Sequence, residues 1–531
     1  MQKLPDITVN AAPKSTNLPE PVRQLPVPGL WGYLSQWSTA PGGSVGVHVS
    51  AEADHEVELL RLGTCALLDP ASSLDDDRAE ATVLQRWSRP AAPQTIAPGS
   101  YVLCGGPPVD TDGLSAGLWL RLWALPKIDV VQVAYAGIIG DIDYPDCARF
   151  GLLLDHVGQI GVYCGDGGPF RYSALHRTAP VLADRLGSWC HVAATVSHEG
   201  CVVYVDGAQV ARFDGASLPP QPAGSRFRIG AMAEGSAAAN FLDGDIAQSF
   251  LGSPITASAA RSLYDAQGAR PVSEILGEAL HAEWPLDEED GVDVADRSGN
   301  ARHGTIVNHG CWMVGGPAFD AKGCRPDNHD PSRAPHRGHG LRLCSDSLMD
   351  ARWPVAIEAP IAAEAPSGVY GIRVRLVGQD DAAALTMPLV VSRRTPPTED
   401  CLAIIAATNT WHAYGRRPTN ELAVHGLTSS LYSTHRNGRP FFHLGLRLPL
   451  PHADPFRYET ARAAQTRSTH LVRTERHLEA WLRREGYRFE MVSDLDLHVE
   501  PELLERFRAV AVVGHNEYWS DEARDGLERY L

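Results

Sequence analysis

The strongest indication of fold is the stretch WCHVAATV at residues 189–196, followed by CVVYVDGAQVA at residues 201–211. Both runs are rich in valine and aromatic residues, which favour strands. Asp206-Gly207 divides the second run into two short segments, and this dipeptide predicts a β-hairpin with a tight turn. Runs that alternate with the period of a strand lie nearby, at residues 118–123 and 149–154. We therefore predict one large β-sandwich over residues 109–320.

The residues before this sandwich predict a smaller β domain over residues 29–108. Residues 45–50 and 56–62 alternate there with the strand period. Residues 1–28 are polar and rich in proline, so we expect an N-terminal arm. Beyond the sandwich, residues 321–395 are expected to form a connecting loop and strands.

The last region, residues 396–531, has the pattern of an α/β domain. Residues 401–408 are a continuous apolar run, which is typical of a parallel strand covered on both faces. The elements expected after it are a helix at 467–486, a strand at 487–492, a short helix at 501–507, a strand at 509–514 and a helix capped by Ser520. This alternation predicts an incomplete doubly wound α/β domain, in which ligands gather at the carboxyl ends of the strands.

The composition excludes several functional classes. The chain has 531 residues, of which 44% are hydrophobic and 21% charged, as in folded soluble proteins. Its formal net charge of −17 opposes binding to nucleic acid or to anionic lipid, so we expect neither partner. No stretch approaches the ~18 consecutive apolar residues of a membrane helix. The ten cysteines are scattered, which favours reduced thiols and a cytoplasmic location.

Residues 321–345 are basic and rich in histidine. Cys324, His329, His336 and His339 suggest a metal site, but their spacing matches no structural zinc pattern. Solvated loop residues are the favoured interpretation.

Three motifs lie at or near the expected carboxyl ends of the α/β strands: TNTWHAY at 408–414, GLTSSLYSTH at 426–435 and GHNEYWS at 514–520. Loops held by a rigid sheet often carry catalytic residues. From the residues alone other roles stay open, because the tyrosines could pack beneath loops and Glu517 could cap the following helix. His412 and His435 are also possible ligands, although histidines this near a strand end more often hydrogen-bond to a metal ligand or lie on the surface.

The hairpin segment and the three motifs each resemble a known family. The hairpin segment, with W-x-H-V-A followed by Y-V-D-G-x-x-V, resembles laminin-G/concanavalin-like sandwiches. The motifs T-N-T-W-x-A-Y, S-L-Y-S-T-H-x-x-G and G-H-N-E-Y-W resemble the large (β) subunit of N,N-dimethylformamidase. The fold class implied is multidomain: an N-terminal β domain and a laminin-G-like β-sandwich, followed by an incomplete, glutamine-amidotransferase-like α/β domain.

The second resemblance implies a mononuclear iron site. Carried over residue by residue, the metal ligands are Tyr414, Tyr432 and Glu517, and His515 is the catalytic residue beside the metal. Tyr458 stays open as an alternative to Tyr432. Phenolate and carboxylate are hard anionic donors that suit Fe(III).

The implied reaction is hydrolysis of a small N-substituted formamide by metal-activated water, giving dimethylamine and formate from N,N-dimethylformamide. His515 would transfer a proton or orient the water, because imidazole titrates near neutral pH. The resemblance also implies a small partner subunit and an oligomer of the large subunit.

Two departures from the family shape the expectations. The family continues beyond H-N-E-Y-W with further strands and a second catalytic carboxylate, so we expect this chain to be truncated at its C-terminus. The basic run Arg416-Arg417-Pro418 also lies close to the expected site. The alternative function is a non-catalytic carbohydrate- or protein-binding module with a degenerate α/β domain, and a weaker one is a glycosidase-like metal hydrolase.

Overall fold

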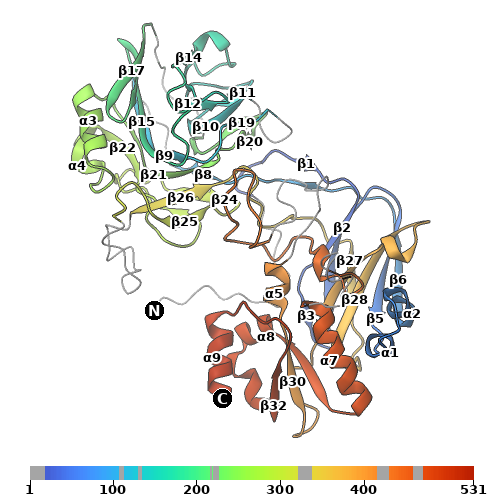
Figure 1. The fold of residues 1–531 in the computed structure, drawn as a ribbon. Helices are drawn as coiled ribbons and strands as arrows, with labels where there is room; N and C mark the ends of the chain where they lie inside the picture. Colours follow the sequence, from blue (N-terminus) through green and yellow to red (C-terminus); the bar gives the residue numbers. More distant parts are fainter. Residues whose placement is uncertain are drawn as a thin grey trace.

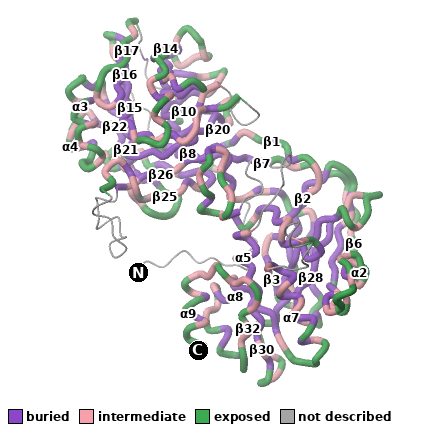
Figure 2. Tube along the Cα trace, viewed as in Figure 1, coloured by how far each residue is buried: buried purple, intermediate pink, exposed green. Residues whose placement is uncertain are grey.

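The computed structural model describes residues 18–106, 113–128, 134–215, 218, 226–320, 338–414, 430–458, 464 and 470–531. Figure 1 shows two lobes, one built from the central part of the chain and the other from its N-terminal and C-terminal parts. In both lobes the strands are largely buried and the connecting loops exposed (Figure 2). No helix in the described ranges is long and apolar enough to cross a membrane.

The first lobe is a β-sandwich of two eight-stranded sheets, as predicted. One sheet has the order β14 (Leu175–Arg177), β13 (Ile160–Cys164), β12 (Phe150–Asp155), β10 (Tyr135–Gly140), β18 (Arg228–Ile229), β8 (Tyr101–Cys104), β24 (Gly304–Val307) and β23 (Asp293–Val294). The other has the order β17 (Ala208–Phe213), β16 (Gly200–Val205), β15 (Trp189–Ser197), β9 (Leu114–Leu122), β21 (Gly244–Gly252), β26 (His339–Leu343) and β25 (Cys311–Val314), with β22 (Leu280–Trp284) paired to β21. Side chains of both sheets, such as Leu152 and Val192, share one buried core.

The predicted Asp-Gly hairpin is confirmed. Strands β16 and β17 pair in antiparallel fashion. In the turn between them, Asp206 and Gly207 have φ angles of 51° and 72°. Aspartate and glycine are among the residues that adopt this left-handed region most readily.

The second lobe contains a smaller β unit that joins distant parts of the chain. Its two sheets are β2 (Leu30–Leu34), β4 (Ser44–Ala51) and β27 (Ile357–Pro360), and β3 (Ser38–Thr39), β29 (Leu385–Val391), β28 (Gly368–Leu376), β5 (His55–Arg61) and β6 (Thr82–Arg89). The region 321–395, predicted to connect domains, therefore supplies three strands to sheets that begin in the N-terminal region. Conversely, strand β8 lies within residues 29–108, the predicted small β domain, but pairs with strands of the sandwich.

The C-terminal part forms a three-stranded parallel sheet with the order β31 (Phe489–Ser493), β30 (Leu402–Ala406) and β32 (Ala509–Val512). Its helices are α5 (Thr408–Ala413), α7 (Val472–Glu485), α8 (Asp494–Val499), α9 (Asp521–Tyr530) and the 3-10 helix η6 (Pro501–Arg506). Helix α7 ends at Gly486, whose φ is 78°, and the predicted cap of α9 is present because Ser520 Oγ accepts from Ala523 N at 3.2 Å.

Strand β30 is covered on both faces, as its apolar run predicts. Ile404 packs in a core shared with α7 and the small β unit, whereas Ile405 packs in a second core with α8, η6 and α9. The sheet is therefore held rigidly against the rest of its lobe, and its carboxyl edge is a fixed platform for the loops that follow.

The remaining elements are short. They are β1 (Leu25–Pro26), β7 (Thr95–Ile96), β11 (Asp143–Tyr144), β19 (Met232–Glu234), β20 (Ala237–Ala239), α1 (Cys65–Leu68), α2 (Leu74–Glu80), α3 (Ala257–Asp265), α4 (Ser273–Leu276), and the 3-10 helices η1 (Tyr172–Ala174), η2 (Gly277–Ala279), η4 (Asp381–Ala383) and η5 (Pro451–Ala453).

Candidate functional site

Two neighbouring parallel strands bring two of the sequence motifs together. Helix α5 follows β30, and residues 514–519 follow β32, so both segments leave the same edge of the sheet. Thr410 Oγ1 in α5 accepts a hydrogen bond from Glu517 N at 3.0 Å. This bond ties the two segments to each other directly above the sheet.

The side chains of all four predicted site residues meet at this edge. Tyr414 Oη donates to Glu517 Oε2 at 2.9 Å, and Tyr432 Oη donates to Glu517 Oε1 at 2.9 Å. The two tyrosine rings lie 4.6 Å apart between centroids. His515 Nε2 lies 2.9 Å from Glu517 Oε2. We call these four residues the Tyr–Tyr–Glu–His cluster.

Tyr432 reaches the cluster from a loop. Residues 415–429 lie outside the described residues, including the basic run at 416–418 and part of the second motif. Leu431 N donates to Ala413 O at 3.0 Å, which joins the loop to the end of α5. Buried Ser430 accepts from Tyr432 N through its Oγ at 3.0 Å. These bonds hold the Tyr432 backbone beside Tyr414.

The cluster is open to solvent. Tyr432 is 53% exposed, and the side chains of His515 and Glu517 are 34% and 38% exposed. Among the described residues, the side chains of the cluster are therefore partly exposed to solvent.

The mutual contacts shift the ionisation of these groups. Burial raises the pKa of the Tyr414 phenol, and the Glu517 carboxylate raises it further. The hydrogen bond with Tyr414 raises the pKa of Tyr432 to about 12. Partial desolvation raises the pKa of Glu517, but hydrogen bonds from both tyrosines and the nearby His515 outweigh it and lower that pKa overall. Without a cation the cluster is thus a carboxylate held by two neutral phenols.

Two further residues at the cluster were not predicted. Tyr518 Oη lies 2.8 Å from Tyr432 Oη, and burial followed by this hydrogen bond raises the pKa of Tyr518. The His470 ring lies 4.9 Å from the Tyr414 ring and 5.4 Å from the His515 ring, between centroids. Tyr518 could have been found, since it belongs to the third motif. His470 precedes helix α7 in a polar stretch of sequence, and no motif there indicates a role at the site.

The other histidines and the alternative tyrosine lie elsewhere. Tyr458 lies under the Arg473 guanidinium, 5.2 Å from ring centroid to Cζ, and no described contact joins it to Glu517. His412 is buried with its ring edge against Trp37, and burial lowers its pKa to about 3. His435 Nδ1 lies 2.7 Å from Asp346 Oδ1.

Two buried carboxyl groups support the turn from β30 into α5. Asp494 Oδ2 accepts from Asn409 N at 3.0 Å, and Glu475 Oε1 accepts from Trp411 Nε1 at 3.0 Å. Burial raises the pKa of Asp494 to about 7 and that of Glu475 to about 8. The segment that carries Thr410 is thus held from both sides.

The oxygen atoms of the cluster have a spacing that fits a small cation. Tyr432 Oη lies 2.9 and 3.1 Å from the two Glu517 oxygens, and Tyr414 Oη lies 2.9 Å from one of them. Adjacent oxygen ligands of an octahedral cation with bonds of ~2.0–2.1 Å are about 2.9 Å apart. Three hard oxygen donors that already converge in this way fit an ion such as Fe(III).

Most of the other candidate metal residues lie outside the described part of the chain. Cys324, His329 and His336 lie outside the described residues, and His339 is the first residue of β26. In the parts of the chain that the structure describes, no group of three or more histidine, cysteine, aspartate or glutamate residues is arranged to hold a metal ion.

Comparison with protein families gives two matches. Residues 322–531, which contain every residue of the Tyr–Tyr–Glu–His cluster, match the family described as N,N-dimethylformamidase beta subunit-like, C-terminal. This confirms the predicted family resemblance. Residues 97–249 match the concanavalin A-like lectin/glucanases superfamily, in agreement with the sandwich that precedes the dimethylformamidase-like region. No curated protein matches the chain.

Several solved structures resemble parts of the chain at low sequence identity. A putative carbohydrate-binding protein from Bacteroides ovatus is 14% identical, with 52% of this chain and 90% of that chain covered and a TM-score of 0.29. A heptameric SAP-like pentraxin from Limulus polyphemus is 12% identical, with 48% and 94% covered and a TM-score of 0.27. The CBM40 of a Ruminococcus gnavus IT-sialidase is 12% identical, with 29% and 83% covered and a TM-score of 0.24.

Proposed function

We propose that this chain is an iron-dependent amidohydrolase that acts on a small N-substituted formamide and converts N,N-dimethylformamide to dimethylamine and formate. The observation that carries the proposal is the convergence of Tyr414, Tyr432 and Glu517 oxygens at 2.9 to 3.1 Å. The match of residues 322–531 to the dimethylformamidase-like family supplies the substrate class.

In this proposal Tyr414, Tyr432 and Glu517 hold one Fe(III) ion. Both phenols lose their protons when the cation binds, so that two phenolates and one carboxylate balance its charge. The bound ion would supply Lewis-acid polarisation of the amide carbonyl and a more acidic water. Three singly charged anionic ligands would bring the net charge of the site to zero and leave coordination positions open for substrate.

His515 is the proposed proton carrier. Its Nε2 lies 2.9 Å from Glu517 Oε2, so the imidazole is directly beside the proposed metal ligands. An imidazole there can accept a proton from the attacking water at Nδ1, because Nε2 faces the Glu517 carboxylate, and can deliver it to the amine nitrogen. Delivery matters because an amide anion is a very poor leaving group, whereas the protonated amine departs readily.

The wider architecture is also part of the proposal. We infer that the three-stranded parallel sheet and its helices belong to a doubly wound α/β domain of the glutamine-amidotransferase-like type. A small partner subunit, oligomerisation of the large subunit and a cytoplasmic location follow from the same family resemblance and remain proposals.

The direct test is amine release by the iron-loaded full chain, compared between dimethylformamide, formamide and larger amides. We expect release from dimethylformamide, and a loss of about 10²–10⁴-fold for His515→Gln with iron content unchanged. His498→Gln is the matched control, since His498 also lies beside a glutamate, with its Nδ1 3.0 Å from Glu522 Oε2. Iron binding without release of amine from any amide would contradict the enzymatic proposal.

A second candidate is carbohydrate binding by the sandwich, favoured by the superfamily match of residues 97–249. It predicts saturable binding to a glycan array that survives Glu517→Gln. It also predicts no amine release, which separates it from the first candidate.

A further inference from the structure

The loop that carries Tyr432 extends away from the α/β sheet and folds onto the sandwich. We call residues 430–443 the Tyr432 loop. It turns back at Gly438, whose φ is 80° and whose N donates to His435 O at 2.9 Å. Thr434 and Pro440 form an antiparallel bridge across the turn. The loop is therefore a small, internally bonded unit, and the H-x-x-G part of the second motif forms its turn.

A carboxylate of the sandwich lobe holds one side of this turn. Asp346, just beyond strand β26, accepts from His435 Nδ1 at 2.7 Å and from Arg436 N at 2.8 Å. Asp346 is only 4% exposed, so both bonds are shielded from water. Hydrogen bonds to a shielded carboxylate are among the stronger ones in proteins.

A second carboxylate holds the tip. Asn437 Nδ2 donates to Asp243 Oδ1 at 3.2 Å, and Asn437 is 8% exposed. Asp243 is itself fixed by Ser345, whose N and Oγ donate to it at 2.9 and 2.7 Å. The tip of the loop is thus inserted between residues of the sandwich lobe.

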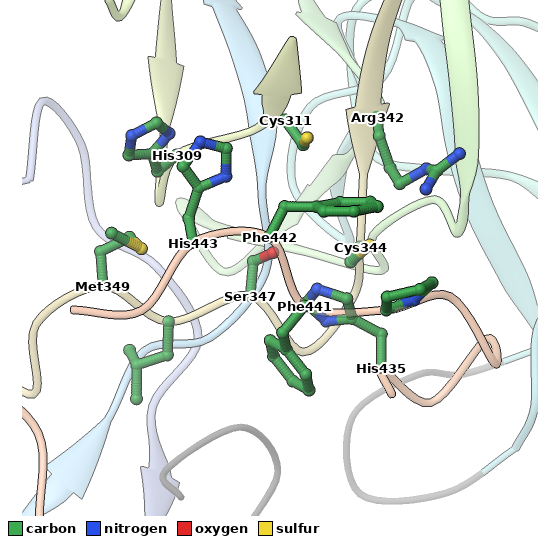
Figure 3. Close-up of a pocket in the computed structure, with 12 residues that line it drawn as sticks. His309, Cys311, Arg342, Cys344, Ser347, Met349, His435, Phe441, Phe442 and His443 are labelled. Atoms are coloured by element: carbon green, nitrogen blue, oxygen red, sulfur yellow. The ribbon is translucent and has the colours of Figure 1, made fainter. Parts of the chain in front are cut away.

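Side chains pack closely where the loop and the sandwich meet. Figure 3 shows His435, Phe441, Phe442 and His443 of the loop facing Cys311, Arg342, Cys344 and Ser347. The cavity between them has a volume of about 20 Å³, about enough for one water molecule. The Arg439 guanidinium also lies 4.0 Å from the Trp123 ring centroid.

We propose that Asp346 is a positioning residue for Tyr432, so that the sandwich forms part of the support of the candidate metal site. The role of Tyr432 in this inference rests on the proposed function. Only two residues, Ser433 and Thr434, lie between Tyr432 and His435, so the two Cα atoms are at most ~11 Å apart. Ser433, inside that span, is bonded back across Tyr432 to the start of the loop, because its Oγ donates to Ser430 O at 2.8 Å and accepts from Ser430 N at 3.0 Å. We therefore expect that loss of the hydrogen bonds to Asp346 displaces the phenol of Tyr432.

The test compares Asp346→Ala with Asp155→Ala in the full chain. Asp155 is a matched control because it is also 4% exposed and also accepts two hydrogen bonds, in its case from Val157 N and Gln159 N at 3.0 and 2.8 Å. It lies in the sandwich and has no described contact with the Tyr432 loop.

The first readout is hydrogen exchange in the iron-free protein. We expect Asp346→Ala to speed exchange of peptides within 430–443 by ~10-fold or more and also to speed exchange of 514–519, while Asp155→Ala leaves both unchanged. Asp346→Asn keeps one acceptor oxygen and should lie between wild type and alanine. Wild-type exchange of both segments in Asp346→Ala would overturn the inference.

The second readout is the iron complex. Loss of a residue that orients a ligand costs ~10–100-fold in metal affinity, so Asp346→Ala should weaken iron binding by that factor and shift the phenolate charge-transfer band. If Asp346→Ala does not fold, Asn437→Ala removes the contact at the tip from the loop side and should give the same shifts. Absence of iron binding in the wild type would contradict the proposed function, and the exchange comparison would still decide the anchoring.

Discussion

Tyr432 and Glu517 are 85 residues apart in the sequence, yet Tyr432 Oη donates to Glu517 Oε1 at 2.9 Å. Three structural facts produce this contact. Strands β30 and β32 are neighbours, Thr410 holds Glu517 N, and the Tyr432 loop is anchored on the sandwich. The candidate site therefore depends on both lobes of the molecule.

Tyr518 should tune the iron complex without binding iron. A hydrogen bond to a phenolate withdraws electron density from its oxygen, and Tyr518 Oη lies 2.8 Å from Tyr432 Oη. Tyr518→Phe is expected to move the charge-transfer band to lower energy, as measured by visible absorption, with iron content unchanged. Tyr487→Phe, on an exposed ring stacked against Trp481, should leave the band in place. An unshifted band in Tyr518→Phe would show that this hydrogen bond is absent from the iron complex.

Thr410 should matter for stability and for iron affinity. Thr410→Val keeps the shape of this fully buried side chain but removes the acceptor for Glu517 N. We expect a loss of about 0.5–1.5 kcal/mol in the free energy of unfolding, measured with urea, because this hydrogen bond is lost. Iron affinity should fall as well, because Glu517 loses its backbone anchor. Thr195→Val, a buried threonine of the sandwich that accepts from Ile255 N, is expected to destabilise the protein but leave iron affinity unchanged.

Glu475 should make stability depend on pH. Burial raises its pKa to about 8 from 4.5, so the folded state binds its proton more tightly than the unfolded state. The stability associated with this proton is complete below pH ~4.5 and is lost as the pH rises through about 8. Asp494, whose pKa is raised to about 7, acts in the same direction.

The variant Glu475→Gln should therefore flatten the pH dependence of unfolding between pH 5 and 8. Glutamine can keep the bond that Trp411 Nε1 donates to Glu475 at 3.0 Å while carrying no charge. We expect the variant to gain stability relative to wild type as the pH rises, followed by urea unfolding at several pH values. Glu479→Gln is a suitable control, since Glu479 is buried on the same helix and pairs with Arg483 at 2.8 Å. Parallel curves for wild type and Glu475→Gln would contradict this assignment.

Local elements could be predicted because their signals are local. The Asp206-Gly207 turn, the end of α7 at Gly486 and the cap of α9 at Ser520 each follow from the residues at that point. Pairing over long distances has no such signal. Strand β28 pairs with β5, and Arg373 donates to Glu58 across 315 residues, so the sequence could not show that residues 357–391 complete the N-terminal β unit.

Part of the candidate site could also be predicted from local signals. Tyr414 and Glu517 follow strands recognisable from their apolar runs, and neighbouring parallel strands bring such ends together. The family motif was needed to choose Tyr432 over Tyr458. His470 and the anchor on Asp346 could not be found, because each depends on how distant segments pack in three dimensions.

The most direct test of Tyr432 as an iron ligand is the visible spectrum and iron content of iron-loaded wild type, Tyr432→Phe and Tyr458→Phe. We expect a phenolate-to-Fe(III) band in the wild type, an unchanged band in Tyr458→Phe, and a weakened or shifted band with reduced iron in Tyr432→Phe. A colourless wild type without iron, or a Tyr432→Phe variant with the wild-type band and iron content, would contradict it.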